Sequence, residues 1–146
     1  MWDRAPSGAP FLPPARKGAA GAARSHSSSM SARINYDNRI FKSVANTPNG
    51  EVGGATLFHY RQKGDLVWAS YSGNGIAEGH LIANVAPDGT LDMRYHHRSP
   101  TGALMTGLCR SRLEILPDGR YRLHEAWQWT GGDQSSGTST IEEVRR

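Results

Sequence analysis

Residues 107–129 read GLCRSRLEILPDGRYRLHEAWQW, and polar and apolar residues largely alternate on both sides of Pro117-Asp118-Gly119. Alternation with a period of two is typical of a strand with one buried face. A three-residue Pro-Asp-Gly loop, with the glycine in the left-handed conformation, closes an antiparallel hairpin. This closure predicts a register in which Cys109 faces Trp127 and Gly107 faces Trp129. A small residue opposite a large one fills the space between strands without a clash.

The same register makes predictions for both faces of the hairpin. Ile115 lies opposite Tyr121 on the inner face, and Glu114 lies opposite Arg122 on the outer face. A second hairpin has the same turn at residues 85–91 and pairs Val85 with Leu91, Leu81 with Tyr95, and His80 with His96. We therefore expect the odd-numbered residues of these four strands to face inward.

Turn signals recur along the chain from Ile34 onward, and each supplies a glycine that can adopt a positive φ. They occur at residues 48–50, 63–65, 73–75, 87–89, 100–102, 117–119 and 131–133. Seven short turns separate eight strand-like segments, and short connections make neighbouring strands antiparallel. The sequence predicts an all-β domain over residues 34–146, a closed up-and-down barrel of about eight strands with a calycin-like or lipocalin-like shape. The alternative is a two-sheet β-sandwich.

The predicted interior contains polar side chains among large aromatic ones. The candidate ligand-binding residues are Glu125, Trp127, Trp129, Tyr95, His97 and Tyr121. Either Tyr71 or Trp68 is expected to join them inside. An eight-stranded barrel is filled by its own side chains or holds one small ligand.

Glu125 is the most informative candidate, because period two places it on the same face as both tryptophans. A buried carboxylate is costly unless it is hydrogen-bonded or paired with a charge. We expect a partner among Ser111 directly across, His97, a tyrosine hydroxyl or an arginine from a barrel end. Glu125 then anchors a ligand, acts as a general acid or base, or is only structural.

Other reactive residues favour simpler interpretations. His80 and His96 face each other outside, but a zinc site needs three or four converging ligands, so we expect no metal. Cys109 is expected to be buried and to behave as a small hydrophobic residue. Outward-facing arginines at positions 94, 98, 110, 112, 120 and 122 fit an ordinary charged surface, or an acidic partner.

The basic charge of the chain belongs to its first 33 residues. The net charge is +4, and residues 1–33 account for all of it, with five basic residues against Asp3. The rest of the chain sums to zero, so we expect no nucleic-acid partner. Proline, alanine, glycine and serine predict a disordered basic tail over 1–33. This tail is a targeting peptide, a functional arm or an over-extended reading frame that truly starts at Met30, and we favour the last interpretation.

The sequence also bears on compartment. No apolar run approaches the roughly 20 residues of a membrane span, so we expect no membrane partner. Cys109 is the only cysteine, which is compatible with a reducing cytoplasm, where we expect the protein.

Four segments carry a family resemblance. They are residues 34–39 (INYDNR), 58–62 (FHYRQ), 91–95 (LDMRY) and 123–130 (LHEAWQWT). They resemble a family of small bacterial proteins often labelled N-acetylglutamate synthase, over about residues 34–144. The label implies an acetyltransferase, whose loop amides would hold acetyl-CoA at a helix N-terminus. Gly73-Asn74-Gly75 instead lies between two strand-like segments, so the residues indicate no catalytic group and no cofactor, and favour a protein that is not an enzyme.

Three functions remain open at this point. The first is a barrel that binds a small hydrophobic or aromatic ligand at one mouth. The second is a filled barrel with a structural or protein-interaction role. The third is an enzyme that uses Glu125 and His97 as acid and base, including the labelled acetyltransferase activity.

Overall fold

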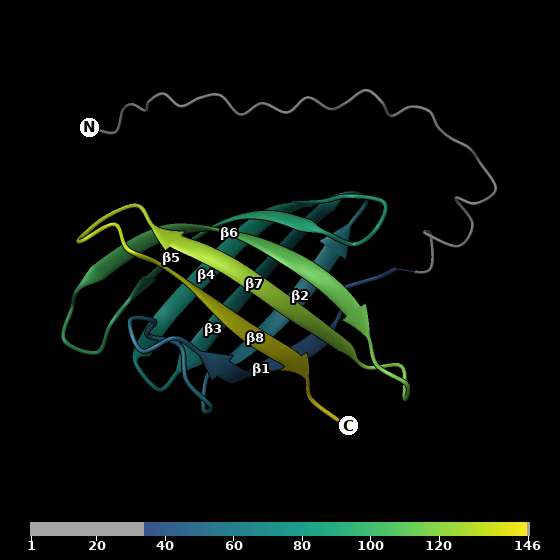
Figure 1. Cartoon of the computed structure of the whole chain (residues 1–146), viewed down its shortest axis with the longest axis horizontal. Coiled ribbons are helices and arrows are strands. Elements are labelled where there is room, and N and C mark those ends of the chain that lie inside the picture. Colours follow the sequence, from purple (N-terminus) through teal and green to yellow (C-terminus); the bar gives the residue numbers. More distant parts are fainter. Residues whose placement is uncertain (1–33, 146) are drawn as a thin grey trace. The chain divides into compact units, whose positions relative to one another are not determined.

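The computed structural model describes residues 34–145, and these form a closed antiparallel barrel of eight strands in sequential order. Figure 1 shows the strands following one another around the barrel, with β1 (blue) beside β8 (yellow). The structure therefore confirms the barrel and excludes the sandwich. The strands are β1 (Arg39–Asn46), β2 (Leu57–Lys63), β3 (Leu66–Gly73), β4 (Ile76–Val85), β5 (Leu91–Arg98), β6 (Leu104–Ile115), β7 (Tyr121–Trp129) and β8 (Ser136–Glu143).

Both Pro-Asp-Gly hairpins have the predicted register. Cys109 pairs with Trp127, Glu114 with Arg122 and Ile115 with Tyr121 across β6 and β7. His80 pairs with His96 across β4 and β5. The glycines of the two turns, at positions 89 and 119, each have a φ of 90°, which side chains rarely tolerate. The two turns thus fix the register of β4 with β5 and of β6 with β7.

Two local features depart from the pattern. Ile115 is 55% exposed although it has an odd number, because β6 ends there and the chain turns; Leu116, the next residue, is buried instead. Residues 51–56, expected to continue as strand after the turn at 48–50, form an irregular loop, and β2 begins only at Leu57. This β1–β2 loop, residues 47–56, contains Gly53-Gly54, a pair that weakens strand formation.

One end of the barrel, which we call the closed end, carries the turns at 86–90 and 116–120. Tyr36, just before β1, is fully buried there and donates a hydrogen bond to the carbonyl oxygen of Gly89 at 2.5 Å. Its ring packs edge-on against Tyr121, with centroids 5.5 Å apart. An aromatic plug of this kind leaves only the opposite end, here called the open end, for access to the interior.

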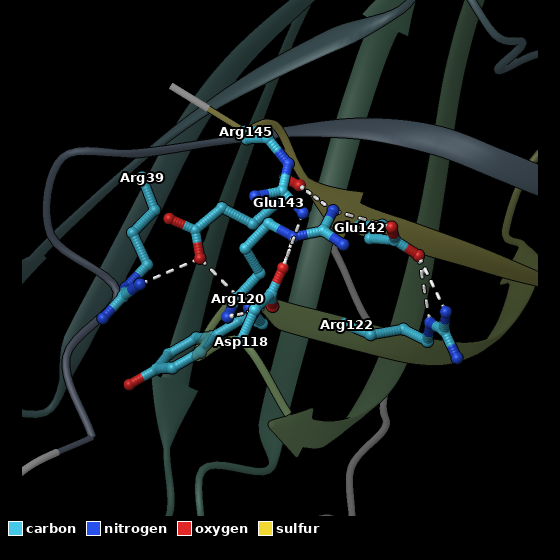
Figure 2. A network of polar contacts seen from close by, with 8 residues as sticks. Arg39, Asp118, Arg120, Arg122, Glu142, Glu143 and Arg145 are labelled. Carbon is cyan, nitrogen blue, oxygen red and sulfur yellow. Dashed lines mark hydrogen bonds and ion pairs between the residues drawn. The ribbon is translucent and has the colours of Figure 1, made fainter. Parts of the chain in front are cut away.

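A network of charged side chains lies at the closed end (Figure 2). Glu143 is 8% exposed, accepts a hydrogen bond from Arg39 at 2.8 Å and another from the backbone amide of Tyr121 at 3.0 Å. Glu142 lies between Arg120 and Arg122 and pairs with both at 2.9 Å. These contacts connect β8 to β7 and to β1. The barrel closes between β1 and β8.

The predictions for the tail concern residues 1–33, including the proposed start at Met30, and lie outside the described residues. Within residues 34–145, no helix is long and apolar enough to cross a membrane.

Candidate functional site

A cavity of about 50 Å³ lies inside the barrel toward the open end. Its walls include five aromatic side chains, two carboxylates and an imidazole. Residues 50–52 of the β1–β2 loop form one side of it. The lining residues are Asn46, Gly50, Glu51, Val52, Phe58, Tyr71, Leu81, Met93, Tyr95, His97, Cys109, Glu125, Trp127, Trp129 and Ser139.

The β1–β2 loop is held in place by hydrogen bonds at both of its sides. The side-chain amide of Asn46 donates to the carbonyl oxygen of Val52 at 3.0 Å. The indole of Trp129 donates to the carbonyl oxygen of Asn49 at 3.3 Å, and the Asn49 amide donates to the hydroxyl of Ser135 at 3.0 Å. The loop is therefore bound to β7 and to the β7–β8 turn, and it forms one wall of the cavity.

Glycines on the strands set the positions of the aromatic walls. A Cβ at Gly107 would lie 2.3 Å from the ring of Tyr95, and one at Gly137 would lie 2.5 Å from the ring of Trp127. Each ring therefore lies directly on the backbone of a neighbouring strand. Trp129 completes this wall, with its ring centroid 5.5 Å from that of Trp127 and 5.8 Å from that of Tyr95.

Glu125 lies in the interior wall of β7, as predicted, and makes the predicted hydrogen bond to Ser111 directly across. Its carboxylate accepts one hydrogen bond from Ser139 at 2.8 Å and a longer one from Ser111 at 3.4 Å. Burial raises the pKa of Glu125 to about 7, and the two hydroxyl hydrogen bonds oppose this rise. Neither partner carries a charge.

His97 holds a second polar group in the same cavity. Its side chain is buried, its Nδ1 lies 3.0 Å from the hydroxyl of Tyr71, and its Nε2 lies 3.0 Å from the carboxylate of Glu51. Burial lowers the pKa of His97, although the hydrogen bond to Glu51 works in the opposite direction. The imidazole thus links the barrel wall to the β1–β2 loop.

Five of the six predicted ligand-binding residues line this one cavity: Glu125, Trp127, Trp129, Tyr95 and His97. Tyr121 does not, because it lies at the closed end against Tyr36. The alternation along β7 predicted the correct face for Tyr121, which is buried, but period two does not say which end of a strand lies at a ligand site.

Sequence reasoning left Tyr71 and Trp68 as alternatives and missed the contribution of the loop. Tyr71 is the inner residue, whereas Trp68 is 37% exposed on the outer face of β3. Glu51 and Val52 had no detectable signal, because irregular loops have no period from which a direction can be predicted. Phe58 could have been found, since it alternates with the exposed His59 and precedes the buried Tyr60.

Outside the barrel, His80 and His96 lie face to face with ring centroids 5.7 Å apart. The imidazole of His80 contacts the carboxylate of Glu78, two residues earlier on the same face of β4, at 2.7 Å. Among residues 34–145, no cluster of three or more histidine, cysteine, aspartate or glutamate side chains is arranged to hold a metal ion.

Comparison with known proteins agrees with this geometry. No curated protein matches the chain. The family model described as avidin-like protein matches residues 34–144, the same span as the barrel and the resemblance found in the sequence. The match lends no support to the N-acetylglutamate synthase label. Since the matched span covers the whole barrel, the chain belongs to the avidin-like protein family.

Proposed function

We propose that this barrel binds a small molecule at its open end, in the cavity under the β1–β2 loop. The observation that carries the proposal is the composition of the cavity wall. Aromatic faces surround a few polar groups, Glu125 and His97 foremost, that have no role in closing the barrel. Apolar walls with a small number of placed polar groups are typical of ligand sites.

The size of the cavity limits the ligand. Sites for drug-sized molecules measure about 300–1,000 Å³, and this cavity measures about 50 Å³. One water needs roughly 10–15 Å³ by the same kind of measure. The part of the ligand that is enclosed therefore has only a few non-hydrogen atoms, and a larger hydrophobic or aromatic part lies toward the mouth, where the loop must move to admit it.

The same small volume favours a second candidate function, a filled barrel with a structural or interaction role. The two candidates differ in one respect that is easily measured. A barrel that binds a ligand needs its cavity. A barrel with only a structural role becomes more stable when a larger side chain fills the cavity, because unfilled space costs packing energy.

Native mass spectrometry of the full chain, purified from its own cells without refolding, tests the proposal. We expect an adduct at stoichiometric occupancy that is released on denaturation. Cys109→Leu adds two non-hydrogen atoms to the cavity wall and should abolish the adduct, whereas Ser70→Leu, on the exposed outer face of β3, should keep it. Absence of an adduct on the unaltered chain would support the filled barrel, and equal retention by Cys109→Leu would show that the ligand does not occupy this cavity.

A further inference from the structure

Among the residues that the structure describes, the carboxylate of Glu125 has no cationic partner. None of the ion pairs within residues 34–145 involves it. No lysine or arginine lines the cavity either. The only basic side chain there, His97, already contacts the carboxylate of Glu51. The cavity therefore has an excess of negative charge whenever Glu125 is ionised.

Further polar atoms near this carboxylate lack partners. The side-chain oxygen of Asn46 is buried and accepts no hydrogen bond. Its orientation is fixed, because the amide nitrogen of the same group donates to Val52. The hydroxyl of Tyr60 is also buried without a partner. Burial raises the pKa of that phenol, and the nearby charge of Glu125 adds to the rise. Buried acceptors without donors are uncommon and costly.

The remaining walls suit a positive charge. The rings of Trp127, Trp129 and Tyr95 border the cavity, and an aromatic face attracts a cation within about 6 Å of the ring centre. A metal ion does not fit such walls, because hard cations need several oxygen ligands. A neutral ligand would leave the carboxylate without a compensating charge, and an anion would be repelled by it.

We propose that the cavity binds a protonated amine, with the ammonium group donating to Glu125 and the attached carbon chain lying against Trp127 and Trp129. This inference rests on the proposed function and specifies its ligand class. A primary ammonium is a compact group with three donors, which suits a small cavity lined by the Glu125 carboxylate and the unpartnered oxygen of Asn46. The apolar part of the amine extends toward Val52 and the mouth.

The first test compares two probes of the same size and shape, n-butylammonium and 1-butanol. Tryptophan indole N–H signals are followed by NMR on the full chain, with the exposed Trp68 as the internal reference. We expect n-butylammonium to shift the Trp127 and Trp129 signals in a saturable way, and 1-butanol to bind at least about 10-fold more weakly, as expected for a lost charge-assisted hydrogen bond. Equal affinity for the two probes would overturn the inference.

Variants separate the carboxylate from the rest of the site. Glu125→Gln keeps the shape and should lower n-butylammonium affinity about 10-fold or more, with little effect on 1-butanol. Glu114→Gln is the matched control, because Glu114 is on the outer face and pairs with His124 and Arg122. A Glu125→Gln chain that binds the amine as tightly as the unaltered chain would also contradict the inference.

The affinity should also depend on pH in a defined direction. The amine stays protonated up to about pH 10, whereas Glu125 ionises around pH 7. Affinity should therefore fall roughly 100-fold from pH 8 to pH 5, and protonation of His97 at low pH acts in the same direction. Four neutral groups bear on Glu125, because Tyr60, Tyr71, Tyr95 and Cys109 all have raised pKa values. Glu51 lies beyond His97. Arg110, Arg112 and His124 line a separate open groove that Glu125 also borders. Affinity that is unchanged or higher at pH 5 would contradict the assignment.

Failure of this inference is distinguishable from failure of the proposed function. If the indole signals do not respond to the amine but the natural adduct persists in native mass spectrometry, the ligand is not an amine and the barrel still binds a small molecule. If the adduct is absent as well, both proposals fail.

Discussion

Glu125 is the residue on which the proposed ligand binding depends most. Its carboxylate is part-buried beside aromatic rings, and its hydrogen bonds come from the hydroxyl groups of Ser111 and Ser139. An ionised carboxylate at this position lowers the stability of the ligand-free fold, because burial disfavours its charge. Such a cost is common at functional positions, and it is consistent with the proposed binding role.

This cost predicts how stability responds to pH. Because the pKa of Glu125 rises from its ordinary value near 4.5 to about 7, the folded state holds its proton more tightly than the unfolded state. Ionisation of Glu125 should therefore leave the free energy of unfolding unchanged below about pH 4.5 and should lower it as the pH rises toward 7. Glu125→Gln should thus be more stable than the unaltered, ligand-free chain at pH 8, by on the order of 2 kcal/mol, and nearly equal to it at pH 4.

Urea unfolding at the two pH values measures this difference. If Glu125→Gln is the less stable chain at pH 8, the carboxylate has a stabilising partner and is not an uncompensated group.

At the scale of elements, the site depends on how closely aromatic rings approach neighbouring strands. Tyr95 lies over Gly107, and Trp127 lies over Gly137, where a side chain would overlap the ring. The β1–β2 loop then covers the rings and is linked to β5 through Glu51 and His97. Strand glycines and one loop thus position the site.

Gly107→Ala tests this arrangement. The new Cβ would lie 2.3 Å from the Tyr95 ring and 2.9 Å from the backbone oxygen of Gln128, so the ring or the strand must move. We expect a loss of about 1–3 kcal/mol in the free energy of unfolding, typical of overpacking. Gly131→Ala is the matched control, because its Cβ would meet nothing closer than 3.7 Å; it should change stability by less than about 0.5 kcal/mol. Equal effects of the two substitutions would show that Tyr95 does not depend on Gly107.

Two features of the sequence, the alternation of polar and apolar residues and the turn residues, predicted most of the fold. They gave the strand order, the register of both Pro-Asp-Gly hairpins, and the inward direction of Glu125 and Trp127. They did not give the path of residues 51–56 or the contact between Glu51 and His97, because an irregular loop is positioned by tertiary contacts. Tyr121 faces inward as predicted, but it packs against Tyr36 at the closed end and does not line the cavity.

At the scale of the whole molecule, the two ends of the barrel have different roles. The closed end holds the Tyr36 plug and the charged network of Figure 2, which join the first and last strands. The open end holds the cavity, with the β1–β2 loop as one wall. In the proposed binding role, this separation keeps Glu125 apart from the contacts that close the barrel.

The closed end should therefore be sensitive to loss of Glu143. Glu143→Leu removes the ion pair of Arg39 and the acceptor of the Tyr121 amide. Half-buried charges and unpaired backbone donors are costly, so we expect a loss of about 2–4 kcal/mol, measured by urea unfolding. Asp92→Asn breaks the exposed contact with Arg94 and serves as the control, with an expected effect below about 1 kcal/mol. If the two substitutions cost the same, the network does not hold the barrel closed.

The central claim, that the cavity at the open end is a binding site, is tested most directly by a crystal structure of the full chain purified from its own cells without refolding. The account predicts non-protein electron density that extends from the carboxylate of Glu125, between Trp127 and Trp129, toward the β1–β2 loop. A cavity that holds only ordered water, or that collapses as neighbouring side chains fill it, would contradict the account.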